Sequence, residues 1–407
     1  MDALYRRAAP HDRFGQQTGL MRAIVVGGAG AMGHIVVRDL ARSPGVELVT
    51  VADLDAERAA QVAAATAKES AGAEIRSAGA NVADPAFPDL LAGHDVCIAS
   101  VAYRLNLHIV QACLTAGCHY VDLGGLFHVA RKTLEFDERF RQANLTGVTC
   151  MGGSPGITNL LAVMGARELD PNSVTAIHVR LGATDPSIAG LPLPIPYSLE
   201  TLLDEFSVPA MAYRDGAFQE VEPLSEPEPV DFPEPVGHRT AFTTLHSEVA
   251  TLPRAFPTVS EVTFKISFEP GFAERLQTLT AIGLASTDPI DVKGTLVKPR
   301  DVLLELGRAL PQAEGTEDTE CLRVVLTGTR DKEPATVIAQ SLVTPDRAWG
   351  VGGGGVDTGV PPSIVAQMIA VGEVKGPGMS APEEAVDPDR FFARIAERGV
   401  TYSLHVA

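Results

Sequence analysis

A glycine-rich turn near the start of the chain limits its fold more than any other feature. Residues 22–27 form a short apolar run that suits a buried parallel strand, and residues 31–43 have the pattern of a helix. The glycines between them permit a tight turn, close approach of a pyrophosphate, and close packing of helix on strand. Free N–H groups at the start of the helix then attract phosphates. The turn therefore predicts a dinucleotide site that contains Gly28, Gly30, Ala31, Met32 and Gly33.

Strands and helices continue to alternate as far as residue 151. This alternation is typical of βαβ units. We therefore predict an α/β fold with a Rossmann-type doubly wound parallel sheet, in which ligands bind at the carboxyl ends of the strands. The further strands are expected at 47–53, 74–80, 95–101, 119–123 and 147–151, and the helices at 54–68, 106–116 and 127–144.

The pattern changes after residue 156. Runs typical of strands become more frequent than helices, which favours a mixed α+β second domain. Helices are expected at 157–168, 272–282 and 299–310, and strands at 174–182, 259–268, 322–329 and 335–342. The Pro- and Glu-rich stretch 223–235 predicts a loop, and the glycine run 352–355 predicts a hinge before helices at 362–371 and 388–398.

Composition excludes several classes of partner. The chain has 33 Lys and Arg residues against 51 Asp and Glu, a net charge of −18, and only 5% aromatic residues. Nucleic acids and anionic membranes need a basic surface, so neither is an expected partner. No apolar run is long enough to span a membrane. Five cysteines without metal-ligand spacing predict reduced thiols, no metal and a cytoplasmic location, and residues 1–20 predict a flexible extension.

An acidic residue follows the second predicted strand, where a ribose would bind. Asp53 lies 20 residues after the last glycine of the turn, and its carboxylate would bind both ribose hydroxyls and repel a 2′-phosphate. Asp55 adds a negative charge, and the first basic residue is Arg58. NAD is therefore the expected cofactor, and NADP is the alternative if Arg58 turns towards a phosphate. Ser100 and Val101, at the end of another strand, are expected to complete the cofactor site.

Several blocks of sequence together resemble the saccharopine dehydrogenase-like family. In the first half, beside the glycine turn, these are His119–Gly125 (HYVDLGG) and Gly153–Ile157 (GSPGI). In the second half, three blocks are similar to the lysine 6-dehydrogenase branch: Pro196–Thr201 (PYSLET), Thr244–Pro253 (TLHSEVATLP) and Thr358–Pro361 (TGVP). The resemblance extends from about residue 21 to the C-terminus. Distant members include saccharopine reductases and carboxynorspermidine dehydrogenases, so the family does not define the substrate.

The resemblance implies an NAD(P)-linked enzyme that acts on a C–N bond of an amino acid or amine. It also implies that a dinucleotide-binding domain, residues 21–155, is interrupted by an inserted mixed α+β domain for substrate binding and dimerisation, residues 156–350. Residues 351–407 would then return to the first domain. A homodimer or larger homo-oligomer is the expected assembly.

Two residues are candidates for proton transfer. Asp122 ends the fifth predicted strand, so its carboxylate is expected at the crevice, where Gly124 and Gly125 let a substrate approach; a turn cap is the alternative. His246 is suited to proton transfer near neutral pH. If the TLHSE block is a strand, positions 246 and 248 share one face and enter one site. A buried histidine bonded to a backbone carbonyl is the alternative.

An acid-rich stretch over residues 197–205 contains one phenol, Tyr197, which we expect to take part in catalysis. The carboxylates of this stretch would hold a substrate ammonium, although a solvated acidic face has the same pattern. Arginines would anchor the substrate carboxylate through bidentate pairs, unless they are ordinary surface residues. The expected substrate ligands are Arg104, Gly124, Gly125, Thr158, Glu200, Glu205 and Arg254, with Arg180 as a further candidate anchor.

Three functions remain open at this point. Oxidative deamination of the ε-amino group of L-lysine to the semialdehyde, with NAD, is the favoured hypothesis. The second is reductive condensation of an amine with a carbonyl acid, as in saccharopine or carboxynorspermidine formation, which two arginines converging on one site would favour. The third is a non-catalytic protein that binds NAD.

Overall fold

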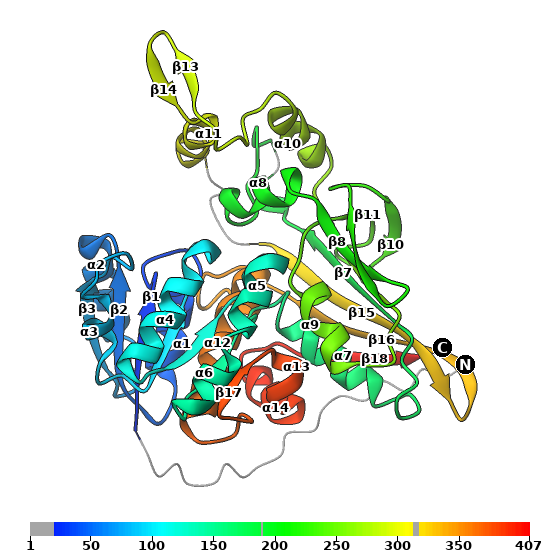
Figure 1. The fold of residues 1–407 in the computed structure, drawn as a ribbon, viewed down its shortest axis with the longest axis horizontal. Coiled ribbons are helices and arrows are strands. Elements are labelled where there is room, and N and C mark those ends of the chain that lie inside the picture. The colour runs from blue at the N-terminus through cyan, green and yellow to red at the C-terminus, as the bar shows by residue number, and fades with distance from the viewer. Residues whose placement is uncertain (1–19, 189, 312–316) are drawn as a thin grey trace.

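The computed structural model describes residues 20–188, 190–311 and 317–407, which form two large sheets joined by helices (Figure 1). The predicted extension over residues 1–20 lies outside the described residues, apart from Leu20. In Figure 1 the first sheet lies to the left, and the strands of the second sheet cross the right-hand side.

The first sheet is the predicted Rossmann-type sheet. Seven strands lie in the order β17-β6-β5-β4-β1-β2-β3, and all neighbouring pairs are parallel. The six strands expected before residue 151 are all present, and a seventh comes from the C-terminal part of the chain. The strands are Met21–Val26 (β1), Val46–Asp53 (β2), Glu74–Gly79 (β3), Val96–Ala99 (β4), His119–Asp122 (β5), Thr146–Val148 (β6) and Gly378–Ser380 (β17).

Helices cover both faces of this sheet because successive strand residues alternate in direction. Ala23 and Val25 of β1 belong to the core that includes α1 and α12, whereas Ile24 and Val26 belong to the core that includes α4. The single helix expected over 127–144 is two helices, α5 and α6, with a break at residues 135–136. The helices are Gly33–Arg42 (α1), Ala56–Ala67 (α2), Phe87–Leu91 (α3), Asn106–Ala116 (α4), Leu126–Leu134 (α5), Asp137–Gln142 (α6), Gly353–Ala370 (α12), Pro382–Ala385 (α13) and Pro388–Ala396 (α14).

The second sheet has nine strands and confirms the predicted mixed domain. Its main path is β10-β11-β12-β7-β15-β16-β18, with β8 paired to β12 and β9 paired to β8. The β12–β7 pair is parallel, and the other pairs are antiparallel. The strands are Ala176–Thr184 (β7), Ala210–Arg214 (β8), Ala217–Val221 (β9), Glu228–Asp231 (β10), His238–Thr243 (β11), Glu261–Ser267 (β12), Thr319–Arg330 (β15), Glu333–Val343 (β16) and Tyr402–Val406 (β18).

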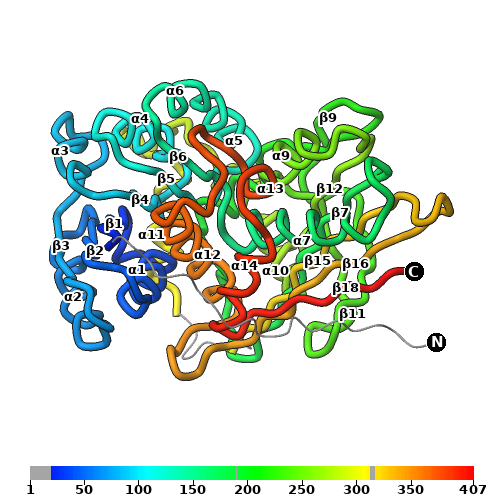
Figure 2. The backbone as a smooth tube through the Cα atoms, turned by 90° about the horizontal axis from the view of Figure 1, so that it is seen from below, coloured from blue at the N-terminus to red at the C-terminus, as the bar shows by residue number. Residues whose placement is uncertain are grey.

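Two expectations differ from the structure at this sheet. The stretch 223–235, expected as a loop, contains β10, which pairs with β11. Residues 351–407 do not all return to the first domain, because β18 lies beside β16 of the second sheet and pairs with it (Figure 2). In contrast, β17 pairs with β6 of the first sheet. The C-terminal segment therefore joins both sheets.

A smaller group of elements projects beside the second sheet (Figure 1). Apolar side chains of three helices form a cluster of their own there. These helices are Leu199–Ser207 (α8), Phe272–Ala281 (α10) and Pro299–Arg308 (α11), and a hairpin extends from them, Ile290–Val292 (β13) with Thr295–Val297 (β14). Two more helices, Ile157–Ala166 (α7) and Glu248–Ala255 (α9), lie between the two sheets.

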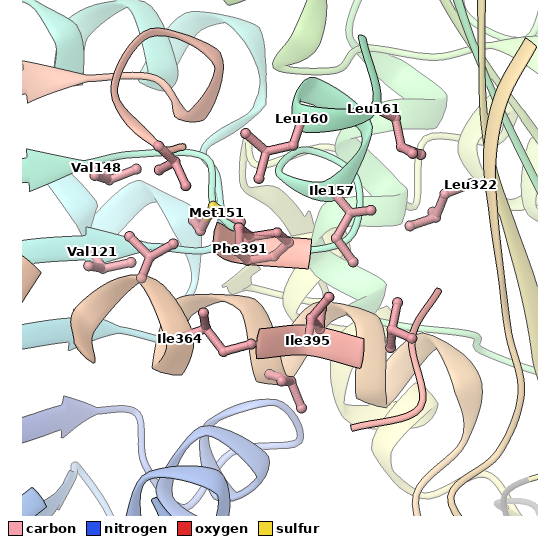
Figure 3. Close-up of a cluster of buried hydrophobic side chains, with 14 of the residues drawn as sticks. Val121, Val148, Met151, Ile157, Leu160, Leu161, Leu322, Ile364, Phe391 and Ile395 are labelled. Atoms are coloured by element: carbon pink, nitrogen blue, oxygen red, sulfur yellow. The ribbon is translucent and has the colours of Figure 1, made fainter. Parts of the chain in front are cut away.

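One apolar core joins the two sheets, and Figure 3 shows its central part. Val121 and Val148 come from the first sheet, and Leu322 comes from β15 of the second. Ile157 of α7 and Phe391 of α14 lie between them, and all five side chains are fully buried. Full burial of each such side chain stabilises the folded protein by about 1.5–3 kcal/mol, so this core holds the sheets in one arrangement.

The glycine run 352–355 begins a helix and is not a hinge. The helix α12 extends from residue 353 to residue 370 through two internal prolines. A Cβ atom at Gly359 would lie 2.7 Å from Cβ of Ile35 in α1. The small residues at the start of α12 therefore let it pack closely against α1, at the edge of the sheet where ligands bind.

Gly33→Ala and Gly30→Ala are expected to separate folding from cofactor binding. A Cβ atom at Gly33 would lie 2.0 Å from the carbonyl oxygen of Gly27, so this variant should lose about 1–3 kcal/mol of unfolding free energy. At Gly30 the same oxygen is 3.1 Å away, so this variant should fold normally but bind dinucleotide more weakly. Thermal unfolding and NADH titration measure the two effects. Equal melting temperatures for the two variants would contradict the prediction.

Candidate active site

The glycine turn has the geometry that a pyrophosphate requires. Within the described part of the chain, the backbone N–H groups of Ala31 and Met32 have no partner, and they directly precede α1. A Cβ atom at Gly27 would lie 2.2 Å from the carbonyl oxygen of Ser100 and 2.8 Å from Cγ1 of Val101. Free donors at a helix N-terminus and a surface that only glycine fits are the features that bind a dinucleotide.

Asp53 lies beside this turn, at the end of β2. Its Oδ2 accepts a hydrogen bond from the N–H of Ala29, and its Oδ1 accepts one from the N–H of Asp55, both at 3.1 Å. Asp55 in turn accepts a hydrogen bond from the N–H of Arg58 at 3.0 Å and caps α2. The carboxylate of Asp53 is therefore fixed at the place where the ribose of a dinucleotide would bind.

Four segments that are far apart in the sequence meet near the ends of β5 and β6. A Cβ atom at Gly124 would lie 2.9 Å from Cγ of Pro155 and 3.8 Å from Oγ of Ser247. A Cβ atom at Gly153 would lie 2.9 Å from Oδ1 of Asp357, in the first turns of α12. The loops after β5 and before α7 and α9 thus meet α12, and together they bound the candidate active site.

His246 and Glu248 form a buried pair at this meeting point. Nδ1 of His246 is hydrogen-bonded to Oε2 of Glu248, and the imidazole stacks on Phe264 with ring centroids 3.7 Å apart. Oε1 of Glu248 accepts hydrogen bonds from Ser154 at 2.5 Å and from Thr158 at 2.8 Å. Because Glu248 holds Nδ1, Nε2 is the imidazole nitrogen that is left to contact another group.

One expectation about these residues is corrected. The TLHSE block is not a strand: β11 ends at Thr243, and α9 begins at Glu248. The side chains at 246 and 248 still meet, because a tight loop leads into the helix. The N-cap of α7 is Gly156, and the hydroxyl of Ser154 in the preceding turn donates to Glu248.

The pKa values of the pair shift in opposite directions. Burial lowers the pKa of His246, but the carboxylates of Glu248, Glu205 and Glu320 outweigh burial and raise it. Burial raises the pKa of Glu248, but His246 and two hydroxyl donors outweigh burial and lower it. Both shifts favour an imidazolium–carboxylate pair.

Tyr197 and Glu205 form a second pair next to the first. The phenol of Tyr197 donates a hydrogen bond to Oε2 of Glu205 at 2.5 Å. Burial, partly opposed by His246 and Tyr197, raises the pKa of Glu205 to about 7. The carboxyl group of Glu205 therefore changes its charge near neutral pH.

Arg104 and Arg300 converge on Asp204. Oδ1 of Asp204 accepts from Arg300 at 2.8 Å, and Oδ2 accepts from Arg104 and from the phenol of Tyr103. Arg104 also pairs with Glu200 at 3.2 Å, and its side chain is 41% exposed. The predicted anchor Arg104 and the predicted ammonium ligand Glu200 thus bind each other in this structure.

The other predicted anchors lie apart from His246. Arg180 pairs with Glu228 at 2.8 Å on the second sheet. Arg254 lies at the opposite end of α9 and pairs with Glu384 at 3.3 Å. Neither guanidinium group reaches the pair formed by His246 and Glu248, so their predicted role in substrate binding has no support from this geometry.

Asp122 is fully buried, and four neighbours occupy its carboxylate. Oδ1 accepts from the N–H groups of Gly124 and Cys150, both at 2.8 Å, and Oδ2 accepts from Tyr120 at 2.7 Å and Thr149 at 2.9 Å. Burial raises the pKa of Asp122 despite these bonds. The geometry is that of a turn cap, the alternative considered above, and its catalytic role stays a prediction.

The structure brings part of the predicted site together. His246, Tyr197, Glu205 and Thr158 gather around the loops that follow β5 and precede α7, although the hydroxyl of Thr158 is engaged by Glu248. Gly124 has φ +124°, and its lack of a side chain admits Pro155, whereas a Cβ atom at Gly125 would meet Val129. Glu320 and Asp357 also lie near this meeting point, although no local motif in the sequence marks either residue.

Comparison with known proteins identifies the family. Residues 24–148 match the model of the saccharopine dehydrogenase NADP binding domain, and residues 152–400 match that of the saccharopine dehydrogenase C-terminal domain. The chain belongs to the saccharopine dehydrogenase family. This confirms the predicted resemblance, and it makes the protein an NAD(P)-dependent oxidoreductase that acts on amines or amino acids.

Relatives and solved structures agree with this assignment. A carboxyaminopropylagmatine dehydrogenase from Synechocystis is 24% identical over 325 residues, 76% of this chain and 79% of the relative. A carboxynorspermidine synthase from Vibrio cholerae is 24% identical over 318 residues, 74% and 75% of the two chains. The apo structure of saccharopine dehydrogenase (L-Glu forming) from Saccharomyces cerevisiae has a TM-score of 0.72 at 18% identity, over 95% of this chain and 100% of that one. That structure confirms the fold.

The length and apolar character of the described helices bear on membrane insertion. None of the helices in the described part of the chain is long and apolar enough to cross a membrane. The cytoplasmic location and the homo-oligomeric state stay predictions.

The carboxylate of Asp53 is expected to make the enzyme prefer NAD to NADP. A fixed negative charge at the ribose repels a 2′-phosphate, so Asp53→Ser should raise the affinity for NADPH relative to NADH by about tenfold. Fluorescence titration with both reduced dinucleotides measures the ratio. Asp84→Ser, an exposed aspartate of the loop after β3, is the control. A wild-type preference for NADPH, or an unchanged ratio in the Asp53 variant, would contradict this prediction.

Proposed function

We propose that the protein is an NAD(P)-dependent dehydrogenase of a carboxylated polyamine, of the carboxynorspermidine type. One observation carries the proposal: the imidazole of His246 is bonded to Glu248, and Glu205 and Glu320 lie close enough for their charges to act on it. An excess of buried carboxyl groups over basic groups favours a substrate with several ammonium groups, which would stabilise the ionised carboxylates. The names of two relatives, from Synechocystis and Vibrio cholerae, refer to carboxylated amines of this class.

The proposed reaction makes or breaks one C–N bond. In the reductive direction the amine adds to the carbonyl carbon, water leaves, and an imine forms. A hydride then adds to the imine carbon and a proton adds to the nitrogen, which gives the secondary amine. Bound NAD(P)H supplies the hydride, and NAD(P)+ accepts it in the reverse direction. Hydrolysis of the imine then releases the carbonyl compound and the free amine.

The residues of the chain bind the substrate and move its protons. His246 exchanges the proton of the reacting nitrogen at Nε2, while Glu248 holds the imidazole in place through Nδ1. Glu205 and Tyr197 hold the reacting amine. Arg104 is exposed and follows β4. Its guanidinium releases Glu200 and binds the substrate carboxylate instead.

Oxidative deamination of L-lysine is the second candidate. The charges of the site also support L-lysine as the substrate. Among the described residues around Asp204, Arg104 is the single partly exposed guanidinium, so one substrate carboxylate can be bound there. L-Lysine carries one carboxylate and two ammonium groups, as this arrangement requires. Saccharopine carries three carboxylates, so the excess of buried acids disfavours it.

Turnover of three substrates tests the proposal. We expect NAD(P)H formation with carboxynorspermidine, with kcat/KM about tenfold or more above that for L-lysine, and no turnover of saccharopine. Absorbance of the reduced cofactor reports the rate, and ammonia release distinguishes deamination of lysine. A higher kcat/KM for lysine would favour the second candidate. If the protein binds NADH but turns over none of the three, the proposed function is wrong.

His246→Gln is expected to lower kcat by about 10²–10⁴-fold, because it removes proton transfer and keeps the size of the side chain. The pH profile gives a second readout: in the oxidative direction the wild-type rate should rise with a pKa above 6.5, because the folded protein raises the pKa of His246. This limb should disappear in the variant.

The matched control for that variant is His178→Gln. His178 also faces a glutamate, Glu261 at 3.4 Å, but on the second sheet outside the site. Its variant should keep the wild-type kcat and pH profile. Retention of the limb in His246→Gln would mean that another group moves the proton.

A further inference from the structure

A second group of carboxylates lies at the start of α12. Oδ2 of Asp318 accepts a hydrogen bond from the N–H of Gly354 at 2.7 Å. A Cβ atom at Gly354 would lie 2.6 Å from Oε2 of Glu320, so the glycine lets this carboxylate approach the helix. Asp357, one turn further along α12, increases the charge, and the charges of Asp318 and Glu320 both act on it.

Asp357 has an oxygen atom without a partner. The residue is 0% exposed, and its Oδ1 accepts a hydrogen bond from Thr358 at 3.1 Å. No group in the described part of the chain donates to Oδ2. A buried carboxylate oxygen without a donor is costly, which indicates that a ligand supplies one.

The chain itself does not neutralise these acids. Among the described residues, neither Glu320 nor Asp357 forms an ion pair with a lysine or arginine. Burial and the neighbouring Asp318 raise the pKa of Glu320 to about 8, and burial and Glu320 raise the pKa of Asp357. The described residues hold no group of three or more His, Cys, Asp or Glu arranged to bind a metal ion. An ammonium group fits the chemistry of these acids, because it carries positive charge and donates hydrogen bonds to an oxygen such as Oδ2 of Asp357.

This group belongs to the same site as His246. The charge of Glu320 contributes to the raised pKa values of His246 and of Tyr197. Oδ1 of Asp357 lies against Gly153, in the turn whose Ser154 holds Glu248. Glu320 therefore lies close enough to His246 for its charge to act on the imidazole.

We propose that Glu320 and Asp357 form a subsite for the second, non-reacting ammonium group of the amine substrate. The ammonium donates to the free Oδ2 of Asp357 and to the carboxylate of Glu320. Asp318 positions this subsite because it fixes the first turn of α12. The inference rests on the proposed function, because both candidate substrates carry such an ammonium group. It makes the charge of the second ammonium group the feature by which the site selects its substrate.

Binding of two small amines tests the subsite without requiring turnover. 1,3-Diaminopropane and propylamine differ by one ammonium group, and calorimetry of the protein with NADH bound gives a Kd for each. We expect the wild type to bind the diamine at least about tenfold more tightly than propylamine. Glu320→Gln and Asp357→Asn should reduce this ratio to near one while leaving the Kd for propylamine within about twofold.

The control is Glu333→Gln, an exposed glutamate at the start of β16, which should keep the wild-type ratio. Melting temperature and NADH affinity report folding, and if Asp357→Asn does not fold, Glu320→Gln decides. A wild-type ratio retained in Glu320→Gln overturns the subsite.

Turnover separates the subsite from the proposed function. If carboxynorspermidine or lysine is oxidised but the binding ratio does not respond to the variants, only the subsite is overturned. If the ratio responds but neither substrate is oxidised, the subsite is supported and the proposed function fails.

Discussion

Glu248 joins parts of the chain that are far apart in the sequence. Its carboxylate is fully buried and accepts hydrogen bonds from Ser154, Thr158 and His246. A buried carboxylate costs several kcal/mol when its partners are removed, so the turn before α7 and the start of α9 must stay together. Stacking of His246 on Phe264 extends this connection to β12. The position of the imidazole over the first sheet therefore depends on one charged group in the interior.

The parts of the fold that depend on local chemistry were predictable from the sequence. The six N-terminal strands and the glycine turn follow from patterns within a few residues, and Asp53 bonds to Ala29 across only 24 positions. The geometry around Glu248 was not predictable in this way, because Thr158 is 90 positions away. The TLHSE block has the alternation of a strand, but the buried carboxylate at its end starts a helix instead.

Two aspartates with the same position on a strand differ in exposure, which the sequence did not predict. Asp53 and Asp122 both end a parallel strand, and the sequence suggested a functional carboxylate at each. Asp53 is only partly buried and remains open beside the glycine turn, whereas Asp122 is fully buried against Tyr120 and Thr149. Thr149 comes after the next strand, so only the pairing of β5 with β6 brings the two residues together. The position of a residue on a strand thus predicts at which edge of the sheet its side chain lies, but not whether that side chain is exposed.

The charge balance of the site follows from the same long-range packing. Acids reach it from α8, α9, β15 and α12, and no single segment looks unusual in a chain of net charge −18. Two arginines that the sequence offered as anchors are bound elsewhere: Arg180 holds Glu228, and Arg254 holds Glu384. The imidazole of His246 is therefore outnumbered by the carboxyl groups whose charges act on it. In the function proposed for this chain, the number of buried acids, and not the sheet, therefore determines how many ammonium groups the substrate carries.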